Sequence, residues 1–133
     1  MSMALNDKQK LPGKNRKFRT SFKFAFKGIQ TVFQEERNMK VHVASLVLVI
    51  LVALFLPLSL NEWLWLLLVS YLVLVMEIVN TVIENLVDLV TQEYHPIAKK
   101  VKDMAAAVVL VTASFAVLVG GIIILPKLIT ILM

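Results

Sequence analysis

The sequence predicts an all-α integral membrane protein, in which three transmembrane helices follow one amphipathic surface helix. The first observation is composition: 59% of the 133 residues are hydrophobic and the mean hydropathy is +0.80, too apolar for an ordinary soluble domain. The second is a set of three long apolar runs, since about 20 apolar residues suffice to cross a bilayer. The third is a helical stripe of aromatic residues before these runs. A chain of this length forms one domain, which we expect over residues 16–133.

The N-terminal region divides into a polar tail and a helix. Residues 1–15 contain Pro12 and Gly13 and are expected to be disordered. A helix is expected over about residues 16–38, because apolar side chains recur there every three or four positions. They are Phe18, Phe22, Phe26, Ile29 and Phe33. Basic residues lie off this stripe, which is typical of a helix lying in the inner membrane interface. Packing against the transmembrane helices is an equally good interpretation, and one helix can do both.

The transmembrane helices are expected over about residues 41–60, 62–90 and 103–126. The first and third runs carry no charge over about the length that a bilayer requires. The middle run is uncharged from Trp63 to Met76 and continues as an amphipathic pattern to Val90. The first run begins too far from the N-terminus to be a cleaved signal peptide. The chain has no cysteine, so we expect neither disulfides nor thiol chemistry.

The distribution of basic residues predicts the orientation in a cell membrane. Ten of the fourteen lysine and arginine residues lie within residues 1–40, and Lys99, Lys100 and Lys102 follow the second run. The connection Pro57–Glu62 has none. By the positive-inside rule, the N-terminus and the second connection are cytoplasmic, and the C-terminus is outside. The net charge of +5 is therefore a topology signal with affinity for anionic lipid, and we expect no nucleic-acid partner.

A stripe of polar residues runs along the inner half of the second transmembrane segment. At about 100° per residue, Glu77, Asn80, Glu84 and Asp88 fall on one face of a helix. Glu77 lies roughly 20 Å from Trp63, inside the hydrocarbon, and Glu84 roughly 10 Å further, near the cytoplasmic surface. Glu84 and Asp88 can therefore be ordinary solvated residues. A carboxylate at the depth of Glu77 normally faces a protein interior or a wet cavity, which indicates function.

Two further polar clusters fall at the same membrane face. One is QEERNMKVH, which contains Glu36, and the other is QEYHPIAKKVKDM in the cytoplasmic connection. Carboxylates from separate helices can hold a hard cation such as Mg²⁺, and nearby lysines suit a polyphosphate. These clusters suggest a metal–nucleotide site next to lipid. The glycines match neither a Walker loop nor the dinucleotide fingerprint.

The motifs EIVNTVIENLVDLV, EYH and AKKVKDMAAAVVL resemble the prokaryotic diacylglycerol kinase family, and specifically its Gram-positive undecaprenol kinase type. The resemblance extends from about Arg16 to the C-terminus and includes EERNMKVH and FKFAFKGI. It implies a homotrimeric lipid kinase that transfers the γ-phosphate of Mg·ATP to undecaprenol. Diacylglycerol is the alternative acceptor.

The same resemblance implies roles for individual residues. Glu77, by its place in EIVN, is expected to be the general base for the lipid hydroxyl. Glu36 and Glu84 are expected to bind Mg²⁺ between the β- and γ-phosphates, and Asn80 to lie between base and metal. Phosphoryl transfer needs mainly positioning and charge neutralisation, so this set is chemically sufficient. The remaining nucleotide contacts are expected from Asp88, Glu93, Tyr94, His95, Lys102 and Asp103.

The N-terminal region departs from the proteobacterial members of the family. Lys17 and Phe24 stand where those members carry arginine and tyrosine. Arg19 can substitute for Lys17, so both are candidate nucleotide-binding residues. His42 stands where the proteobacterial form has an acid, in agreement with the Gram-positive type.

Other functions are compatible with part of this pattern. A small proton-coupled transporter would also place one glutamate inside the membrane. A non-catalytic membrane subunit would tolerate loss of the Glu77 carboxylate. The second acid at Glu84 and the basic cytoplasmic connection favour the kinase. His95 can also be a loop histidine without a role.

Overall fold

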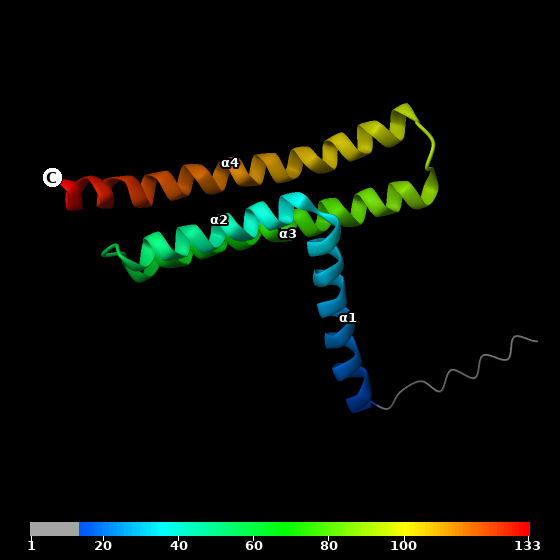
Figure 1. Ribbon diagram of the computed structural model, residues 1–133, viewed down its shortest axis with the longest axis horizontal. Helices are drawn as coiled ribbons and strands as arrows, with labels where there is room; N and C mark the ends of the chain where they lie inside the picture. The colour runs from blue at the N-terminus through cyan, green and yellow to red at the C-terminus, as the bar shows by residue number, and fades with distance from the viewer. Residues whose placement is uncertain (1–13) are drawn as a thin grey trace, which may run out of the picture. The chain divides into compact units, whose positions relative to one another are not determined.

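The computed structural model describes the backbone of residues 14–133 and the side chains of residues 17–133. Over this range the chain is all-α, and no strand occurs in it. Residues 1–13 of the expected tail lie outside the described residues, whereas Lys14 and Asn15, also expected to be disordered, are the first residues of α1. The helices are α1 (Lys14–Glu35), α2 (Arg37–Leu54), α3 (Leu60–Val90) and α4 (Pro96–Leu132) (Figure 1).

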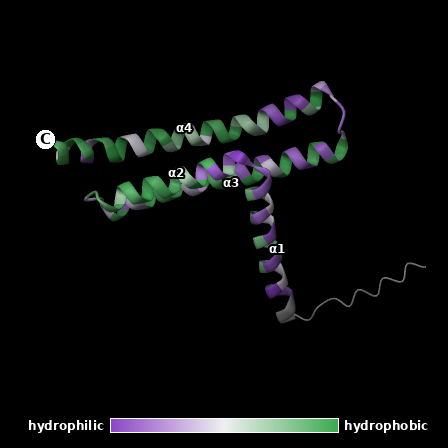
Figure 2. Cartoon of the chain, in the orientation of Figure 1, coloured by the Kyte–Doolittle hydropathy of each residue, from purple (hydrophilic) through white to green (hydrophobic). Residues whose placement is uncertain are grey.

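Three of these helices, α2, α3 and α4, are long and apolar enough to cross a membrane. Residues 55–59 join α2 to α3, and residues 91–95 join α3 to α4. Within this unit α3 packs against both α2 and α4. Figure 2 shows apolar residues along most of the three helices and hydrophilic residues gathered where α3 ends and α4 begins. The chain is therefore a multi-pass membrane protein with its polar groups concentrated at one end of the helices.

The packing between these helices depends on one face of α3. Leu66, Val69 and Val73 are buried and recur at helical spacing. Ala105 and Val109 of α4 are also buried. Most other large apolar side chains of the three helices are exposed in the single chain. Such surfaces suit contact with lipid or with another protein chain.

The boundaries of α1, α2 and α4 differ from the sequence-based expectations. A break at Glu36 ends α1, so that α2 begins at Arg37 rather than near residue 41, and it ends at Leu54, before Pro57. The last helix starts at Pro96 and continues through Pro126 to Leu132. Proline is favoured in the first turn of a helix, where its missing N–H is not needed. Lys99, Lys102 and Asp103 are consequently helical rather than part of a loop.

The end of the bundle opposite the polar cluster is held by a small network. Ser59 and Glu62 form a capping box at the start of α3: Ser59 N donates to Glu62 Oε2 at 2.7 Å, and Glu62 N donates to Ser59 Oγ at 3.2 Å. Lys127 of α4 lies 3.3 Å from Glu62 Oε1 and donates to the Pro57 carbonyl at 3.2 Å. These contacts tie α4 to the turn between α2 and α3.

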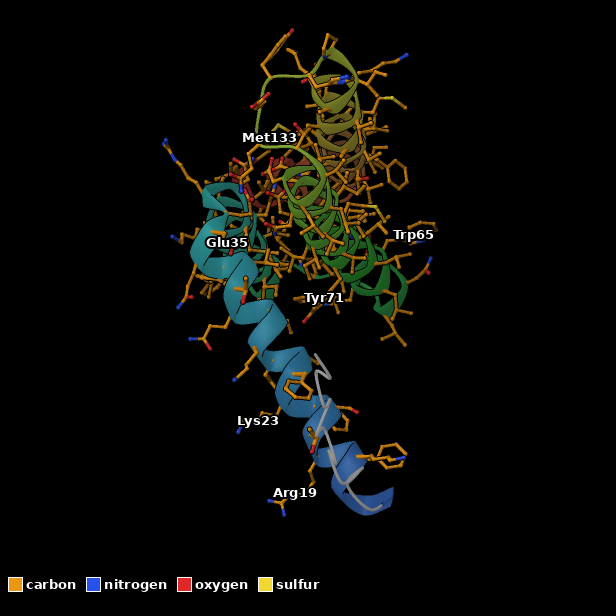
Figure 3. All side chains as sticks on the ribbon, turned by 90° about the vertical axis from the view of Figure 1, so that its right-hand side faces the viewer. Arg19, Lys23, Glu35, Trp65, Tyr71 and Met133 are labelled. Atoms are coloured by element: carbon orange, nitrogen blue, oxygen red, sulfur yellow. The ribbon has the colours of Figure 1, made fainter. Side chains whose placement is uncertain are left out.

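The chain up to Thr31 forms a unit of its own, which contains most of α1. Its apolar stripe is exposed: Phe18, Phe22 and Phe26 are 66%, 65% and 69% accessible. Figure 3 shows Arg19 and Lys23 extending away from the same helix. The helix expected from the aromatic spacing is therefore present, with its stripe uncovered within this unit.

Candidate functional site

Three polar side chains are buried within α3, a helix that is otherwise largely apolar. Glu77 is 0% exposed, and Asn80 and Thr81 are nearly as fully buried. Their spacing of three and four residues places them on neighbouring positions of one helix face. The Thr81 hydroxyl donates to the Glu77 carbonyl at 2.9 Å and needs no further partner. Glu77 and Asn80 thus form the polar centre of the helix.

The Glu77 carboxylate has no hydrogen-bond partner among residues 17–133. Both of its oxygens are buried and unpaired, and so is Asn80 Oδ1. The Asn80 amide instead donates to Glu84 Oε1 at 3.1 Å, which joins the buried centre to the next turn. A buried carboxyl group without a partner is costly. These oxygens can therefore accept a hydrogen bond from a group that the described residues do not supply.

Glu36 brings a carboxylate from a second element. It is the N-cap of α2 in extended conformation, its backbone N–H donates to the Val32 carbonyl at 2.9 Å, and its side chain makes no cap hydrogen bond. Burial raises the pKa of Glu36 above 4.5, and repulsion from Glu84, Glu77 and Glu35 raises it further. Glu36 therefore lies close enough to these carboxylates for their charges to oppose its ionisation.

A cation would relieve this repulsion. In the described part of the chain, no group of three or more His, Cys, Asp or Glu side chains converges as a metal cage. Mg²⁺ is commonly held by one or two carboxylates together with phosphate oxygens and water. Glu36 and Glu84 fit that kind of site, and they do not fit a closed site made by protein alone.

A cavity of about 400 Å³, lined in part by charged side chains, lies beside the connection between α3 and α4. Lys102 of α4 forms an ion pair with Asp88 of α3, at 2.6 Å, and Lys99 pairs with Asp103 one turn apart. The cavity therefore presents both ammonium and carboxylate groups. Six residues expected from the sequence to contact nucleotide line it, namely Asp88, Glu93, Tyr94, His95, Lys102 and Asp103.

His95 has a structural role at this cavity. Its Nδ1 accepts a hydrogen bond from Ile97 N at 3.2 Å and caps α4. Thr91 also lines the cavity, and its hydroxyl lies 3.3 Å from both the backbone nitrogen and the carbonyl oxygen of Glu93. His95 is thus more than a solvated loop residue. The cap nitrogen is occupied, so any contact with a ligand would use another atom of the ring.

Lys17 and Arg19 belong to the separate unit formed by the first part of α1. Their contact with nucleotide stays a prediction.

The structure also shows a contact between two residues that had no assigned role in the sequence-based site. Asn85 donates a hydrogen bond to Glu35 at 3.3 Å, although 50 positions separate them. The only sign of this contact in the sequence is that Asn85 follows Glu84 and Glu35 precedes Glu36.

The chain matches a known protein family over most of its length. The family described as prokaryotic diacylglycerol kinase matches residues 23–124, which include Glu36, Glu77, Glu84 and the cavity but not Lys17 or Arg19.

Individual relatives carry two different names. A diacylglycerol kinase of Synechocystis is 42% identical over 113 residues, covering 84% of this chain and 65% of that protein. An undecaprenol kinase of Bacillus subtilis is 40% identical over 114 residues, covering 86% of this chain and 92% of that protein. A diacylglycerol kinase of Helicobacter pylori is 35% identical over 114 residues, covering 84% and 89%. The chain thus spans about two-thirds of the Synechocystis relative and nearly all of the other two.

Proposed function

The chain belongs to the prokaryotic diacylglycerol kinase family, and we propose that it transfers the γ-phosphate of ATP to the hydroxyl of undecaprenol. The product would be undecaprenyl phosphate, a carrier for cell-wall glycans. One observation carries the proposal: Glu77 is fully buried and unpaired in α3, on the face that leads through Asn80 to Glu84. This arrangement suits a proton acceptor next to a phosphate-binding region, and it favours a kinase over a proton-coupled transporter.

Glu77 is proposed to take the proton from the lipid hydroxyl. A general base must be within hydrogen-bond reach of the proton that it accepts. The two free oxygens of Glu77 offer such a contact, and the full burial of the residue would limit competition from bulk water. The lipid hydroxyl would therefore be held at the depth where its hydrocarbon chain remains in the bilayer.

Glu36 and Glu84 are proposed to hold Mg²⁺. Bound magnesium would neutralise charge on the β- and γ-phosphates and orient them. Asn80 keeps one oxygen of Glu84 in place through its 3.1 Å hydrogen bond. The Asn80 Oδ1 atom remains free to accept from a substrate group between base and metal.

The cavity beside the α3–α4 connection is proposed to bind the rest of the nucleotide. Lys102 is suited to the phosphates, because an ammonium group forms strong charge-assisted hydrogen bonds with phosphate oxygens. Asp88 pairs with Lys102 and restrains it. Glu93, Tyr94, His95 and Asp103 would form the remaining wall. Lys17 and Arg19 would add contacts from α1.

Undecaprenol is the preferred acceptor and diacylglycerol the alternative. The undecaprenol kinase of Bacillus subtilis combines 40% identity with a match over 92% of its own length. The Synechocystis diacylglycerol kinase is matched over 65% of its length, and the Helicobacter pylori diacylglycerol kinase is matched over 89% at 35% identity. Both names occur among the relatives, so the acceptor has to be measured. Either acceptor presents a hydroxyl on a long apolar chain to the same buried carboxylate.

The proposed orientation places the N-terminus and the α3–α4 connection in the cytoplasm, where ATP is available, and the C-terminus outside. The α1 stripe would lie in the inner membrane interface. We also propose a homotrimer. Exposed Ala106 and Ala107 on α4 permit close contact between helices of different subunits.

A competition between the two lipids tests the proposed function. Purified protein in detergent receives Mg²⁺ and γ-labelled ATP with undecaprenol and diacylglycerol at equal concentration, and the labelled lipids are separated. Label mainly in undecaprenyl phosphate is the expected result. Label mainly in phosphatidic acid would mean that diacylglycerol is the acceptor, and it would leave the proposed phosphoryl transfer unchanged. No label in either lipid, from folded protein, would overturn the proposal.

A further inference from the structure

A long-range hydrogen bond joins the end of α1 to the middle of the cytoplasmic half of α3. Asn85 Nδ2 donates to Glu35 Oε2 at 3.3 Å, although 50 positions separate the two residues. Figure 3 shows Glu35 at the end of α1, where the chain turns into α2. Glu35 belongs to the same unit as α2, α3 and α4, which begins at Val32. The contact is therefore part of the unit that contains the candidate site.

The position of this bond in the sequence connects it to the proposed metal ligands. Glu35 immediately precedes Glu36, and Asn85 immediately follows Glu84. The hydrogen bond thus ties together the two neighbours of the carboxylates proposed to bind Mg²⁺. Along α3, Asn85 is turned by about 100° from Glu84, so Glu35 is drawn to the flank of the acidic stripe. Glu35 therefore does not occupy the face of the stripe, and Glu36 is the carboxylate that can approach it.

Glu36 needs such a restraint for two reasons. Its side chain makes no cap hydrogen bond, and its backbone is extended, with φ −101° and ψ 117°. The nearby carboxylates also repel it, so its approach to Glu84 is opposed electrostatically. Buried Val32 and Met39 anchor the chain on either side of the break. The Asn85–Glu35 bond adds a side-chain polar contact with α3 to this apolar anchoring.

We propose that Asn85 and Glu35 are positioning residues, which hold Glu36 opposite Glu84 so that both carboxylates reach the same cation. This inference rests on the proposed function, because it concerns the metal site of that reaction. Neither side chain is required to touch metal or nucleotide. Their effect on turnover passes through the placement of Glu36.

The test measures how Mn²⁺, a paramagnetic substitute for Mg²⁺, binds to the full-length protein together with a non-hydrolysable ATP analogue. Free Mn²⁺ is followed by electron paramagnetic resonance. Removal of groups that orient metal ligands typically weakens metal binding about 10- to 100-fold. We expect Asn85→Ala and Glu35→Ala each to raise the half-saturating Mn²⁺ concentration about ten-fold, and the double variant to raise it no further, since both break one bond.

Glu35→Gln is the matched control for charge. It removes the same negative charge as Glu35→Ala but keeps a carbonyl oxygen that can accept from Asn85. Near wild-type Mn²⁺ binding is expected for this variant. Asn61→Ala, at the other end of α3, controls for loss of an asparagine from the helix. The KM for the lipid should not change in any of these variants, because none of the substituted side chains is proposed to contact the lipid.

Three results would overturn the inference. Unchanged Mn²⁺ binding in Asn85→Ala, additive losses in the double variant, or an equal loss in Glu35→Gln would each remove the positioning role. A lower thermal unfolding temperature with unchanged Mn²⁺ binding would mean a purely structural bond. The proposed function fails by a different result, in which wild-type protein neither binds Mn²⁺ with the analogue nor phosphorylates a lipid.

Discussion

Asn80 donates a 3.1 Å hydrogen bond to Glu84 Oε1, one helical turn further along α3. The donor residue is buried, whereas Glu84 is half-buried, so the bond crosses from the interior of the helix packing to its polar end. The bond also leaves Asn80 Oδ1 without a partner among residues 17–133. Asn80 therefore lies between Glu77 and Glu84 along α3 and bonds to Glu84, the carboxylate proposed to bind Mg²⁺.

Asn80→Ala should weaken the binding of Mg²⁺. The substitution removes the group that orients Glu84, so the Mg²⁺ concentration for half-maximal rate should rise about 10- to 100-fold. Thr81→Val is the matched control, because Thr81 is equally buried and bonds only to the Glu77 carbonyl. Steady-state rates over a Mg²⁺ series measure both variants. Equal effects of the two substitutions would mean that Asn80 acts only through packing.

Glu77→Gln should separate binding from chemistry. The amide cannot accept the proton of the lipid hydroxyl, so kcat should fall about 10²- to 10⁴-fold while the nucleotide still binds. The thermal unfolding temperature should rise, because an unpaired buried carboxylate is replaced by a neutral group. Single-turnover phosphorylation and thermal unfolding in detergent measure the two effects.

The same substitution at Glu62 provides the contrast for Glu77. Glu62 lies in the first turn of α3, several turns before Glu77, where it caps the helix and forms an ion pair with Lys127 of α4. Glu62→Gln should lower the unfolding temperature and leave kcat unchanged. If Glu77→Gln retained wild-type kcat, the assignment of the base would be wrong.

The pKa of Glu36 predicts a pH-dependent metal requirement. Burial, assisted by the charges of Glu84, Glu77 and Glu35, raises this pKa above 4.5. As the pH falls from neutral, Glu36 takes up a proton before an ordinary carboxylate does, and the half-saturating Mg²⁺ concentration should rise. Mg²⁺ titrations at a series of pH values measure this. Glu36→Gln should bind Mg²⁺ weakly at every pH, with a flatter dependence.

In the absence of divalent cations, the stability of the folded protein should fall as the pH rises, whereas Mg²⁺ binding improves. A raised folded-state pKa means that the contribution of Glu36 to stability is fully present below the unfolded value, near 4.5, and is lost as the pH rises through the folded value. Thermal unfolding with a chelator should therefore show wild-type protein losing stability relative to Glu36→Gln as the pH rises. A constant difference between the two proteins would contradict the shifted pKa.

The fold and the acidic stripe could be predicted because both follow from short-range regularities. Apolar run length identifies a membrane helix, and a fixed turn per residue places Glu77, Asn80 and Glu84 on one face. The unpaired state of Glu77 could not be predicted, because it depends on which side chains surround it. The contact of Asn85 with Glu35 spans 50 positions and depends on how the end of α1 packs.

The helix start at Pro96 shows a different limit. Proline inside a helical pattern usually ends the helix, whereas Pro96 opens α4 behind a cap made by His95. The cap depends on the conformation of one side chain, which composition does not reveal. This start makes the segment from Lys99 to Asp103 helical and brings Lys102 to Asp88.

Lys102→Met should impair nucleotide binding without a matching loss of stability. Its ion pair with Asp88 is partly exposed, and pairs of that kind contribute about 1 kcal/mol or less to stability. Loss of a charge-assisted hydrogen bond to a phosphate weakens binding by about 1.5–3 kcal/mol. The KM for ATP should therefore rise about ten-fold or more. Lys100→Met is the matched control, because Lys100 is exposed on the same helix and does not line the cavity. A rise in KM that is equal in both variants would assign the effect to net charge, whereas a rise confined to Lys102→Met requires a direct contact in the cavity.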